Sequence, residues 1–192
     1  MREQVASIAQ PLAPDEVRIF TLDTGESAAV REFARRVLSA LTGIALDEIE
    51  IYAAAKGKPL LRNDPGLHFS ISHARDVAMV AVSRVAPVGV DIEQMRSVPN
   101  AETILSRFFT HEDVSAILTD DRRDLRFIEA WTRSEARVKV RGASVWEAAT
   151  PDPDTTVLQI EAPDGFAAAI AVASTTWFIS QYNISTVDVV AR

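Results

Sequence analysis

Apolar and polar residues alternate in several short stretches of the first half of the chain. Alternation with period two predicts strands at residues 17–22, 49–53, 67–73 and 88–93, and the apolar run at 77–82 predicts a buried strand. We expect the three strands from residue 67 onward to form an antiparallel meander, because they follow one another closely. Between the first two strands, helical spacing predicts one amphipathic helix, whose apolar residues are Val30, Phe33, Ala34, Val37, Leu38 and Leu41.

The second half begins near Pro99 and is first helical and then extended. The pattern predicts a helix over 103–109, a short helix capped by Thr110, and a long helix over 123–140 that stops at Gly142. The apolar stripe of the long helix would include Phe127, Ile128, Trp131 and Val138. The later segments are a loop at 151–154, strands at 157–160, 166–172 and 177–182, and a weaker strand at 187–190.

The order of these elements predicts an α+β fold built from two similar halves. Residues 78–83 resemble residues 169–174, a short similarity that hints at an internal repeat. A helix with a small antiparallel sheet, given twice, would make a pseudo-dimer. We expect an N-terminal half at 1–98 and a C-terminal half at 99–192, forming one compact unit with the active site between them.

The composition narrows the class of protein. Of the 192 residues, 47% are hydrophobic and 24% are charged, as in a globular domain, and no apolar run reaches the length of a membrane span. The absence of cysteine excludes disulfides, thiolate metal sites and cysteine nucleophiles. A net charge of −7 argues against general nucleic-acid binding, for which a basic protein is expected. We expect a cytoplasmic monomer with no nucleic-acid or membrane partner.

The strand Gly89-Val90-Asp91-Ile92-Glu93 carries the first candidate chemistry. Alternation puts the two acids on one face, about 6.6 Å apart along the strand, and the two aliphatic residues on the other. Neighbouring carboxylates repel each other unless a positive charge lies between them. The stretch alone leaves two interpretations open, which are acids that face water and a divalent-cation site.

Glu135 and Lys139 lie four residues apart on the long helix and therefore share a face. Taken alone, they would be a surface ion pair worth ~0.3–0.5 kcal/mol. Beside the acidic strand, they would add a third carboxylate and a lysine, which a site for magnesium and pyrophosphate requires.

Ser72 and His73 end the strand at 67–73, ahead of the acidic strand. A hydroxyl and an imidazole at a strand end suit phosphate recognition, although a lone histidine is more often a bystander. A Ser-His-Asp hydrolase is a weaker alternative, because the chain has no G-x-S-x-G pattern.

Taken in order, four segments resemble the motif series of the 4′-phosphopantetheinyl transferases, in particular the larger, single-chain type that serves surfactin synthetase. These segments are Gly57-Lys58-Pro59, residues 69–73, residues 89–93 and residues 131–139. Residues 107–112 also resemble the family's segment between its two acidic motifs. Each motif alone is weak, but the ordered set, over roughly residues 57–145, is specific.

The resemblance implies the 4′-phosphopantetheinyl transferase fold and a Mg²⁺-dependent enzyme. Such an enzyme moves the 4′-phosphopantetheine arm of coenzyme A to a serine of an acyl or peptidyl carrier protein and releases adenosine 3′,5′-bisphosphate. The carrier would serve fatty acid, polyketide or nonribosomal peptide biosynthesis.

The resemblance also implies roles for individual residues. Asp91, Glu93 and Glu135 would hold Mg²⁺, and Lys139 would steady the pyrophosphate. Glu135, or a water on the metal, would remove the proton of the carrier serine. The residues that would contact coenzyme A are Ser72 and His73 at its phosphates and Lys58 and Pro59 at its nucleotide side.

Two other functions stay open at this point. One is a homologue that binds a carrier or a nucleotide without transfer, and the other is a Mg²⁺-dependent phosphohydrolase. The long helix and the loop before it also carry five arginines, which either meet an acidic carrier or form a solvated face: Arg122, Arg123, Arg126, Arg133 and Arg137.

Overall fold

The structure is a computed structural model of the whole chain, and it describes all residues except 1–9, 24–28, 55–56, 65, 143–152 and 185–192. The helices are α2 (Ala29–Thr42), the 3₁₀ turn η1 (Leu46–Glu48), α3 (Ala101–Phe108), α4 (His111–Thr119) and α5 (Arg123–Arg141). The strands are β1 (Glu16–Asp23), β2 (Ile51–Ala53), β3 (Pro59–Leu61), β4 (His68–Ala74), β5 (Val77–Ser83), β6 (Val88–Gln94), β7 (Thr156–Ile160), β8 (Phe166–Val172) and β9 (Phe178–Ile184). The mixed α+β class is therefore confirmed.

The strands form two sheets and one separate hairpin. The larger sheet has the order β4-β5-β1-β9, in which β1 is antiparallel to β5 and parallel to β9. The smaller sheet has the order β6-β8-β7 and is antiparallel throughout. Among the described strands, β2 and β3 pair only with each other. The last described strand, β9, thus extends a sheet whose other strands come from the first half of the chain.

The predicted meander is wrong at its third strand. β4 and β5 pair as expected, but β5 has β1 on its other edge, so no edge of β5 is free for β6. β6 instead pairs with β8, which lies far away in the sequence. β4 and β6 still lie side by side, because two amides of β6 donate to serine hydroxyls of β4: Val90 N to Ser70 Oγ (3.1 Å) and Ile92 N to Ser72 Oγ (3.3 Å).

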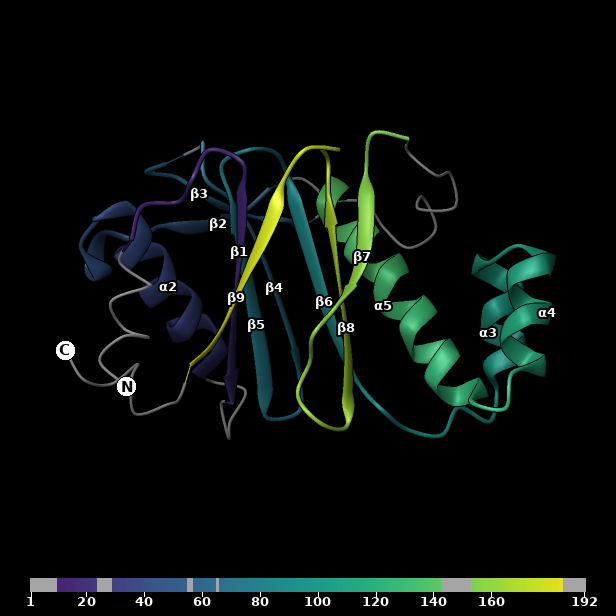
Figure 1. Cartoon of the computed structure of the whole chain (residues 1–192). Coiled ribbons are helices and arrows are strands. Elements are labelled where there is room, and N and C mark those ends of the chain that lie inside the picture. The colour runs from purple at the N-terminus through teal and green to yellow at the C-terminus, as the bar shows by residue number, and fades with distance from the viewer. Residues whose placement is uncertain (1–9, 24–28, 55–56, 65, 143–152, 185–192) are drawn as a thin grey trace.

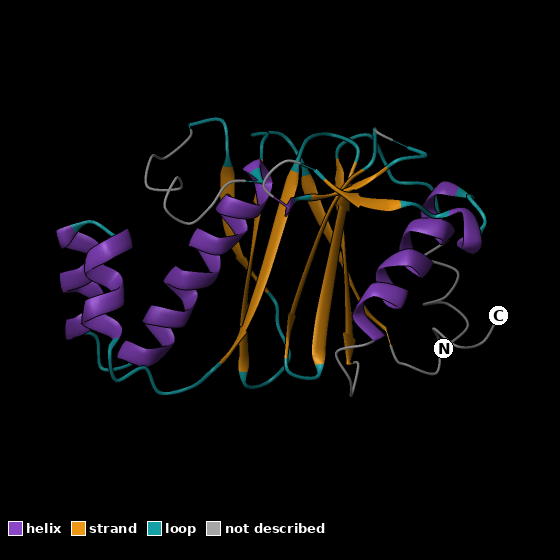
Figure 2. Ribbon diagram, turned by 180° about the vertical axis from the view of Figure 1, so that it is seen from behind, coloured by secondary structure: helices purple, strands orange, loops and turns teal. Residues whose placement is uncertain are grey.

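Apolar clusters show how the layers stack. α2 packs on one face of the larger sheet through residues such as Phe33 and Leu38, which contact Phe20 and Phe69. The other face of this sheet packs on the smaller sheet. α5 covers the outer face of the smaller sheet, and α3 and α4 pack against α5. The two long helices therefore lie on opposite sides of the strands (Figures 1 and 2).

The ends of the helices in the second half agree with the sequence signals. Thr110 caps α4 by accepting a hydrogen bond from Asp113 N (3.2 Å). α5 ends at Gly142, whose φ of +58° is the left-handed conformation that glycine adopts without strain. Trp131 differs from the expected stripe, because it is only partly buried and stacks on Phe127 with ring centroids 6.2 Å apart.

Two expectations fall outside the described residues. The weak strand at 187–190 and the first two positions of the loop at 151–154 cannot be compared with the structure. Within the described part of the chain, no helix is long and apolar enough to cross a membrane.

Candidate active site

Strand β6 presents its acids to α5. Val90 and Ile92 are buried between the two sheets, so Asp91 and Glu93 share the opposite face, as predicted. The helix can approach this face because Gly89 has no side chain. A Cβ at Gly89 would lie 2.1 Å from the carbonyl oxygen of Ala136. The close packing of β6 on α5 brings the acidic motif next to the Glu135–Lys139 face of the helix.

Asp91 is the centre of a buried polar network. Its side chain is buried, and its Oδ1 accepts hydrogen bonds from Lys139 Nζ (2.8 Å) and Ser72 Oγ (2.9 Å). Lys139 Nζ also donates to Ser72 Oγ (2.9 Å). Residues from β4, β6 and α5 therefore meet at one carboxylate, and the sequence prediction that these three residues belong to one site is consistent with this geometry.

The electrostatics of the site favour a cation. Burial raises the pKa of Asp91, although Lys139 and Ser72 act in the opposite direction. Burial, followed by the negative charges of Asp91 and Glu93, also raises the pKa of Glu135. The three carboxylates therefore repel one another electrostatically, and an additional positive charge among them would reduce this repulsion.

The donor set at this place fits Mg²⁺. Carboxylate oxygens are the ligands that this hard cation prefers, and Asp91 Oδ2 is buried without a hydrogen-bond partner among the residues that the structure describes. A buried carboxylate oxygen with no partner is costly unless a cation or donor satisfies it. Within the described part of the chain, no three His, Cys, Asp or Glu side chains are already arranged to hold a metal ion. Lys139 Nζ is the positive charge on Asp91 in this arrangement.

Ser72 and His73 point in different directions. Successive residues of a strand face opposite sides, and in β4 Ser72 is buried against β6 while His73 is exposed. Ser72 Oγ makes hydrogen bonds to Asp91, to Lys139 and to the amide of Ile92. The Ser72 hydroxyl therefore donates one hydrogen bond and accepts two, all within the protein.

Lys58 lies at the turn between β2 and β3 and reaches the end of α5. Its Nζ donates to the carbonyls of Val140 (2.7 Å), Lys139 (2.8 Å) and Val88 (3.2 Å). Burial lowers the pKa of Lys58 to about 8. The neighbouring Pro59 begins β3 and is partly buried.

A cavity of about 310 Å³ opens beside Glu93. Its apolar walls include Ile104, Phe127 and Trp131. Glu93 itself forms an ion pair with Arg96 (2.9 Å), whose side chain is largely exposed. The cavity therefore combines apolar walls with the Glu93–Arg96 ion pair at its edge.

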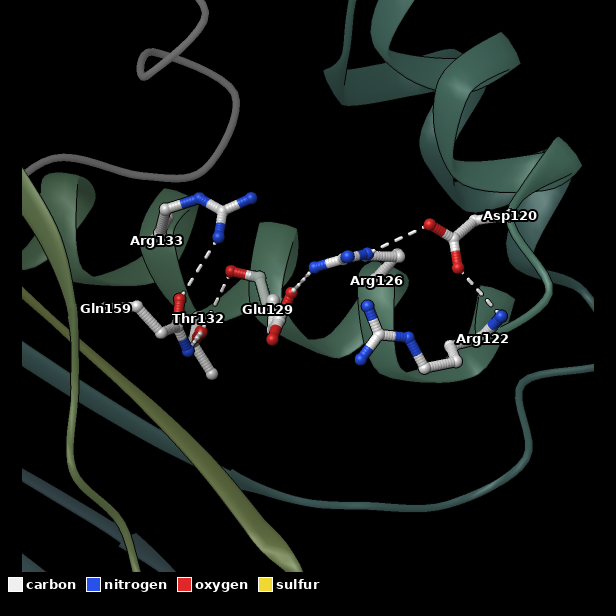
Figure 3. Close-up of polar contacts among 7 residues, drawn as sticks. All are labelled: Asp120, Arg122, Arg126, Glu129, Thr132, Arg133 and Gln159. Atoms are coloured by element: carbon white, nitrogen blue, oxygen red, sulfur yellow. Dashed lines mark hydrogen bonds and ion pairs between the residues drawn. The ribbon is translucent and has the colours of Figure 1, made fainter.

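Arg126 and Arg133 of the long helix have different kinds of partner (Figure 3). Arg126 is held between Asp120 (3.0 Å) and Glu129 (2.9 Å), so its charge is already paired. Among the described residues, Arg133 donates only to a neutral partner, Gln159 (3.1 Å), and burial lowers its pKa although the charges of Glu129 and Asp113 act in the opposite direction. Arg137 has a buried Nε without a hydrogen-bond partner.

Arg133 and Arg137 line a second cavity, of about 490 Å³, between α5 and the α3–α4 pair. Its apolar walls come from Phe108, Phe109 and Ile117. This cavity places two arginines and one acid, Asp113, beside an apolar surface.

Sequence reasoning missed two residues of this region. Ser70 fastens β6 to β4 through the amide of Val90, and Arg96 pairs with Glu93. The spacing of Ser70 and Ser72 was a usable signal, because residues two apart on a strand share a face. Arg96 lies beyond the strand, where alternation gives no information about its direction.

The family model that describes the 4′-phosphopantetheinyl transferase superfamily matches residues 87–186. This stretch is more than half of the chain and contains β6, α5 and the whole smaller sheet. The chain belongs to this superfamily. It is accordingly a member of a transferase superfamily, as its motifs predicted.

Individual relatives agree with the family match. The chain is 26% identical over 198 residues to the 4′-phosphopantetheinyl transferase HetI of Nostoc sp., a match that covers 91% of this chain and 84% of the relative. It is 28% identical over 128 residues to psf-1 of Bacillus pumilus, covering 66% of this chain and 54% of the relative. It is 34% identical over 106 residues to AcpT of Escherichia coli K12, covering 54% of each. The last two matches thus span about half the length of those relatives.

Proposed function

We propose that the protein transfers the 4′-phosphopantetheine arm of coenzyme A to a serine of an acyl or peptidyl carrier protein and releases adenosine 3′,5′-bisphosphate. The observation that carries the proposal is the buried network in which Lys139 and Ser72 hold one oxygen of Asp91 and leave the other without a partner. Family membership supports the type of reaction, and this network supports its location in the structure.

We assign Asp91, Glu93 and Glu135 as the residues that would hold Mg²⁺. When bound, the ion would offset the negative charge of the pyrophosphate and of the three carboxylates. The unpartnered oxygen of Asp91 and the raised pKa values of Asp91 and Glu135 support this assignment.

The transfer itself needs a base and a positive side chain. Glu135, or a water beside it on the metal, would accept the proton of the carrier serine. The serine oxygen forms a bond to the β-phosphorus of coenzyme A, and the bond from that phosphorus to the bridging oxygen breaks. The electron pair leaves with adenosine 3′,5′-bisphosphate, and Lys139 steadies the phosphate charge.

The cavity beside Glu93 suits the pantetheine arm. The arm is long, flexible and uncharged, and the walls formed by Phe127, Trp131 and Ile104 are apolar. His73, which is exposed at the end of β4, and Pro59 remain our candidates for the rest of coenzyme A.

The carrier would dock on α5 beside the α3–α4 pair. Among the described residues, Arg133 and Arg137 have no acidic hydrogen-bond partner, and they lie next to the apolar walls of the second cavity. Glu129 and Asp113 act on Arg133 only through longer-range attraction, so an acidic carrier surface would add negative charge in direct contact with the two arginines. Arg126 is less suitable, because Asp120 and Glu129 already pair with it.

We also propose that residues 1–98 and 99–192 are two related halves. Each half contributes one long helix and most strands of one sheet, while β6 of the first half pairs with β8, and β9 of the second half pairs with β1. The similar segments 78–83 and 169–174 fall on β5 and β8, which are interior strands of the two sheets.

A transfer assay tests the function. The protein is incubated with coenzyme A, Mg²⁺ and a panel of apo carrier proteins, and mass spectrometry looks for the mass of the arm on a carrier. Asp91→Ala and Glu135→Ala should each lower turnover by about 100-fold or more, because each removes a charged group from the reacting centre. Glu50→Ala is the matched control, because Glu50 forms an exposed pair with Arg62 away from the site.

Each outcome separates the functions under consideration. Folded protein that modifies no carrier and binds no coenzyme A in the presence of Mg²⁺ would instead support a carrier-binding homologue. Release of adenosine 3′,5′-bisphosphate without a carrier would indicate a phosphohydrolase. Near-normal turnover of Asp91→Ala or Glu135→Ala would overturn the assignment of the site residues.

A further inference from the structure

Lys58 connects three segments that are far apart in the sequence. It lies on the β2–β3 turn, and its ammonium binds carbonyls of the last turn of α5 and of the first residue of β6. An ammonium has three N–H donors, and three backbone carbonyls accept from it. Lys58 therefore has no donor left for a phosphate in this arrangement.

Two glycines allow close packing where the β2–β3 turn, the end of α5 and the start of β6 meet, a place that we call the junction. A Cβ at Gly89 would collide with the backbone of α5 at Ala136 O and Val140 N. A Cβ at Gly142, just after α5, would lie 2.9 Å from Cβ of Lys58. The stem of Lys58, the end of α5 and the start of β6 are thus in direct contact, and the ammonium closes the junction.

The position of the junction matters for the site. The carbonyl that Lys58 binds at 2.8 Å belongs to Lys139, the residue whose own Nζ lies 2.8 Å from Asp91 Oδ1. Val88, whose carbonyl Lys58 also binds, begins the strand that carries Asp91. One side chain therefore fixes both backbone segments that bring Lys139 and Asp91 together.

We propose that Lys58 is a positioning residue, whose ammonium holds the end of α5 against β6 and thereby places Lys139 on Asp91. The proposal rests on the function proposed above, because it concerns the efficiency of that reaction. It differs from the role that the sequence suggested for Lys58, in which the side chain lines the nucleotide side of coenzyme A. A cation at the end of α5 is also favourable, because the last carbonyls of a helix carry partial negative charge.

Lys58→Met tests the proposal, since methionine keeps much of the apolar stem but donates no hydrogen bond. We expect kcat for transfer to fall by about 10- to 100-fold, because small misplacements of reacting groups have effects of this size. KM for coenzyme A should stay within about twofold of wild type, because the ammonium is not a ligand of coenzyme A. Lys58→Arg should restore most of kcat, because the guanidinium can donate to the same carbonyls. Arg62→Met removes one positive charge from an exposed side chain after the same hairpin and should behave as wild type.

A second readout does not depend on activity. Amine-reactive labelling followed by peptide mass spectrometry reports how accessible each lysine is. In Lys58→Met, labelling of Lys139 should increase, because its hold on Asp91 and Ser72 is loosened. If Lys58→Met does not fold, Lys58→Gln keeps two donors and is tested in the same way.

The outcomes are distinct. A raised KM for coenzyme A with unchanged kcat would overturn the proposal and make Lys58 a ligand. Unchanged kcat and unchanged labelling of Lys139 in a folded variant would also overturn it. If wild-type protein modifies no carrier, the proposed function fails, and the labelling of Lys139 still decides whether Lys58 positions it.

Discussion

At the scale of single residues, surroundings give similar side chains different properties. Asp91 and Glu93 lie two residues apart on one face of β6. Asp91 is buried and bound by Lys139 and Ser72, whereas Glu93 is partly exposed and paired with Arg96. The pKa of Asp91 is raised because of burial. The burial and the hydrogen-bond partners of a carboxylate therefore say more about its pKa and its role than its residue type does.

His68 gives a prediction at this scale. Burial, followed by the positive charge of Lys58, lowers the pKa of His68 from its ordinary value of 6.5. Below that pH the unfolded chain binds more protons than the folded one, so the free energy of unfolding should fall as the pH drops from about 7 to about 5. Urea denaturation at a series of pH values measures this slope, and His68→Gln should reduce it.

His111→Gln is the matched control for His68, because His111 is exposed at the start of α4. Equal slopes for wild type and His68→Gln would contradict the prediction.

At the scale of elements, the site depends on how closely α5 packs on the smaller sheet. Ala136 and Val140 of the helix contact Ala169 and Ala171 of β8, and Gly89 of β6 lies under the same turn. Small residues on both sides let the backbones approach. This approach is what brings Lys139 within hydrogen-bond distance of Asp91.

Gly89→Ala tests this packing. The added Cβ would meet backbone atoms at 2.1 and 2.7 Å, so the helix has to move. We expect the free energy of unfolding to fall by at least about 1–3 kcal/mol, as for other overpacked sites. Transfer activity should fall further than the loss of folded protein explains, because Lys139 moves away from Asp91.

Thermal denaturation and a transfer assay on the folded fraction measure both effects. Gly66→Ala is the matched control, because neither Gly66 nor Gly89 has a positive φ, and a Cβ at Gly66 meets its nearest atom, Asp64 Oδ1, only at 3.6 Å. A Gly89→Ala protein with wild-type stability and turnover would show that the helix does not need this close contact.

At the scale of the whole molecule, the candidate site and the proposed docking surface lie along the same helix. Glu135 and Lys139 of α5 belong to the site at β6, and Arg133 and Arg137 of α5 line the cavity toward α3 and α4. A carrier bound at the arginines would therefore be close in sequence and structure to the residues proposed to act on its serine.

Arg133→Glu tests this arrangement. Reversal of the charge should lower kcat/KM for an acidic carrier by about 5- to 50-fold, because it places like charges across the interface. KM for coenzyme A should change little. Arg62→Glu reverses an exposed charge far along the chain and is the control.

Steady-state transfer at several carrier concentrations makes this comparison, and a lower sensitivity to salt in Arg133→Glu would agree with the loss of an ionic contact. If Arg62→Glu and Arg133→Glu had equal effects, net charge rather than this surface would explain carrier binding.

The sequence by itself determined most of the elements and the chemical type of the protein. Alternation, helical spacing, an apolar run for β5 and the Thr110 cap for α4 located β1, α2, β4, β5, β6, α4, α5 and β8 within a few residues, because these signals are local in the sequence. The ordered motifs led to the correct superfamily. The pairing of Asp91 with Glu93 on one face also followed from period two alone.

Only the tertiary structure decided which elements are neighbours. β6 pairs with β8 and not with β5, because β1 occupies the second edge of β5, and no local pattern records the occupant of an edge. The same holds for polar side chains: Lys58 donates to backbone carbonyls of α5 and β6, and Ser72 donates to Asp91. Their donors are directed by segments distant in sequence, and periodicity contains no information about those contacts.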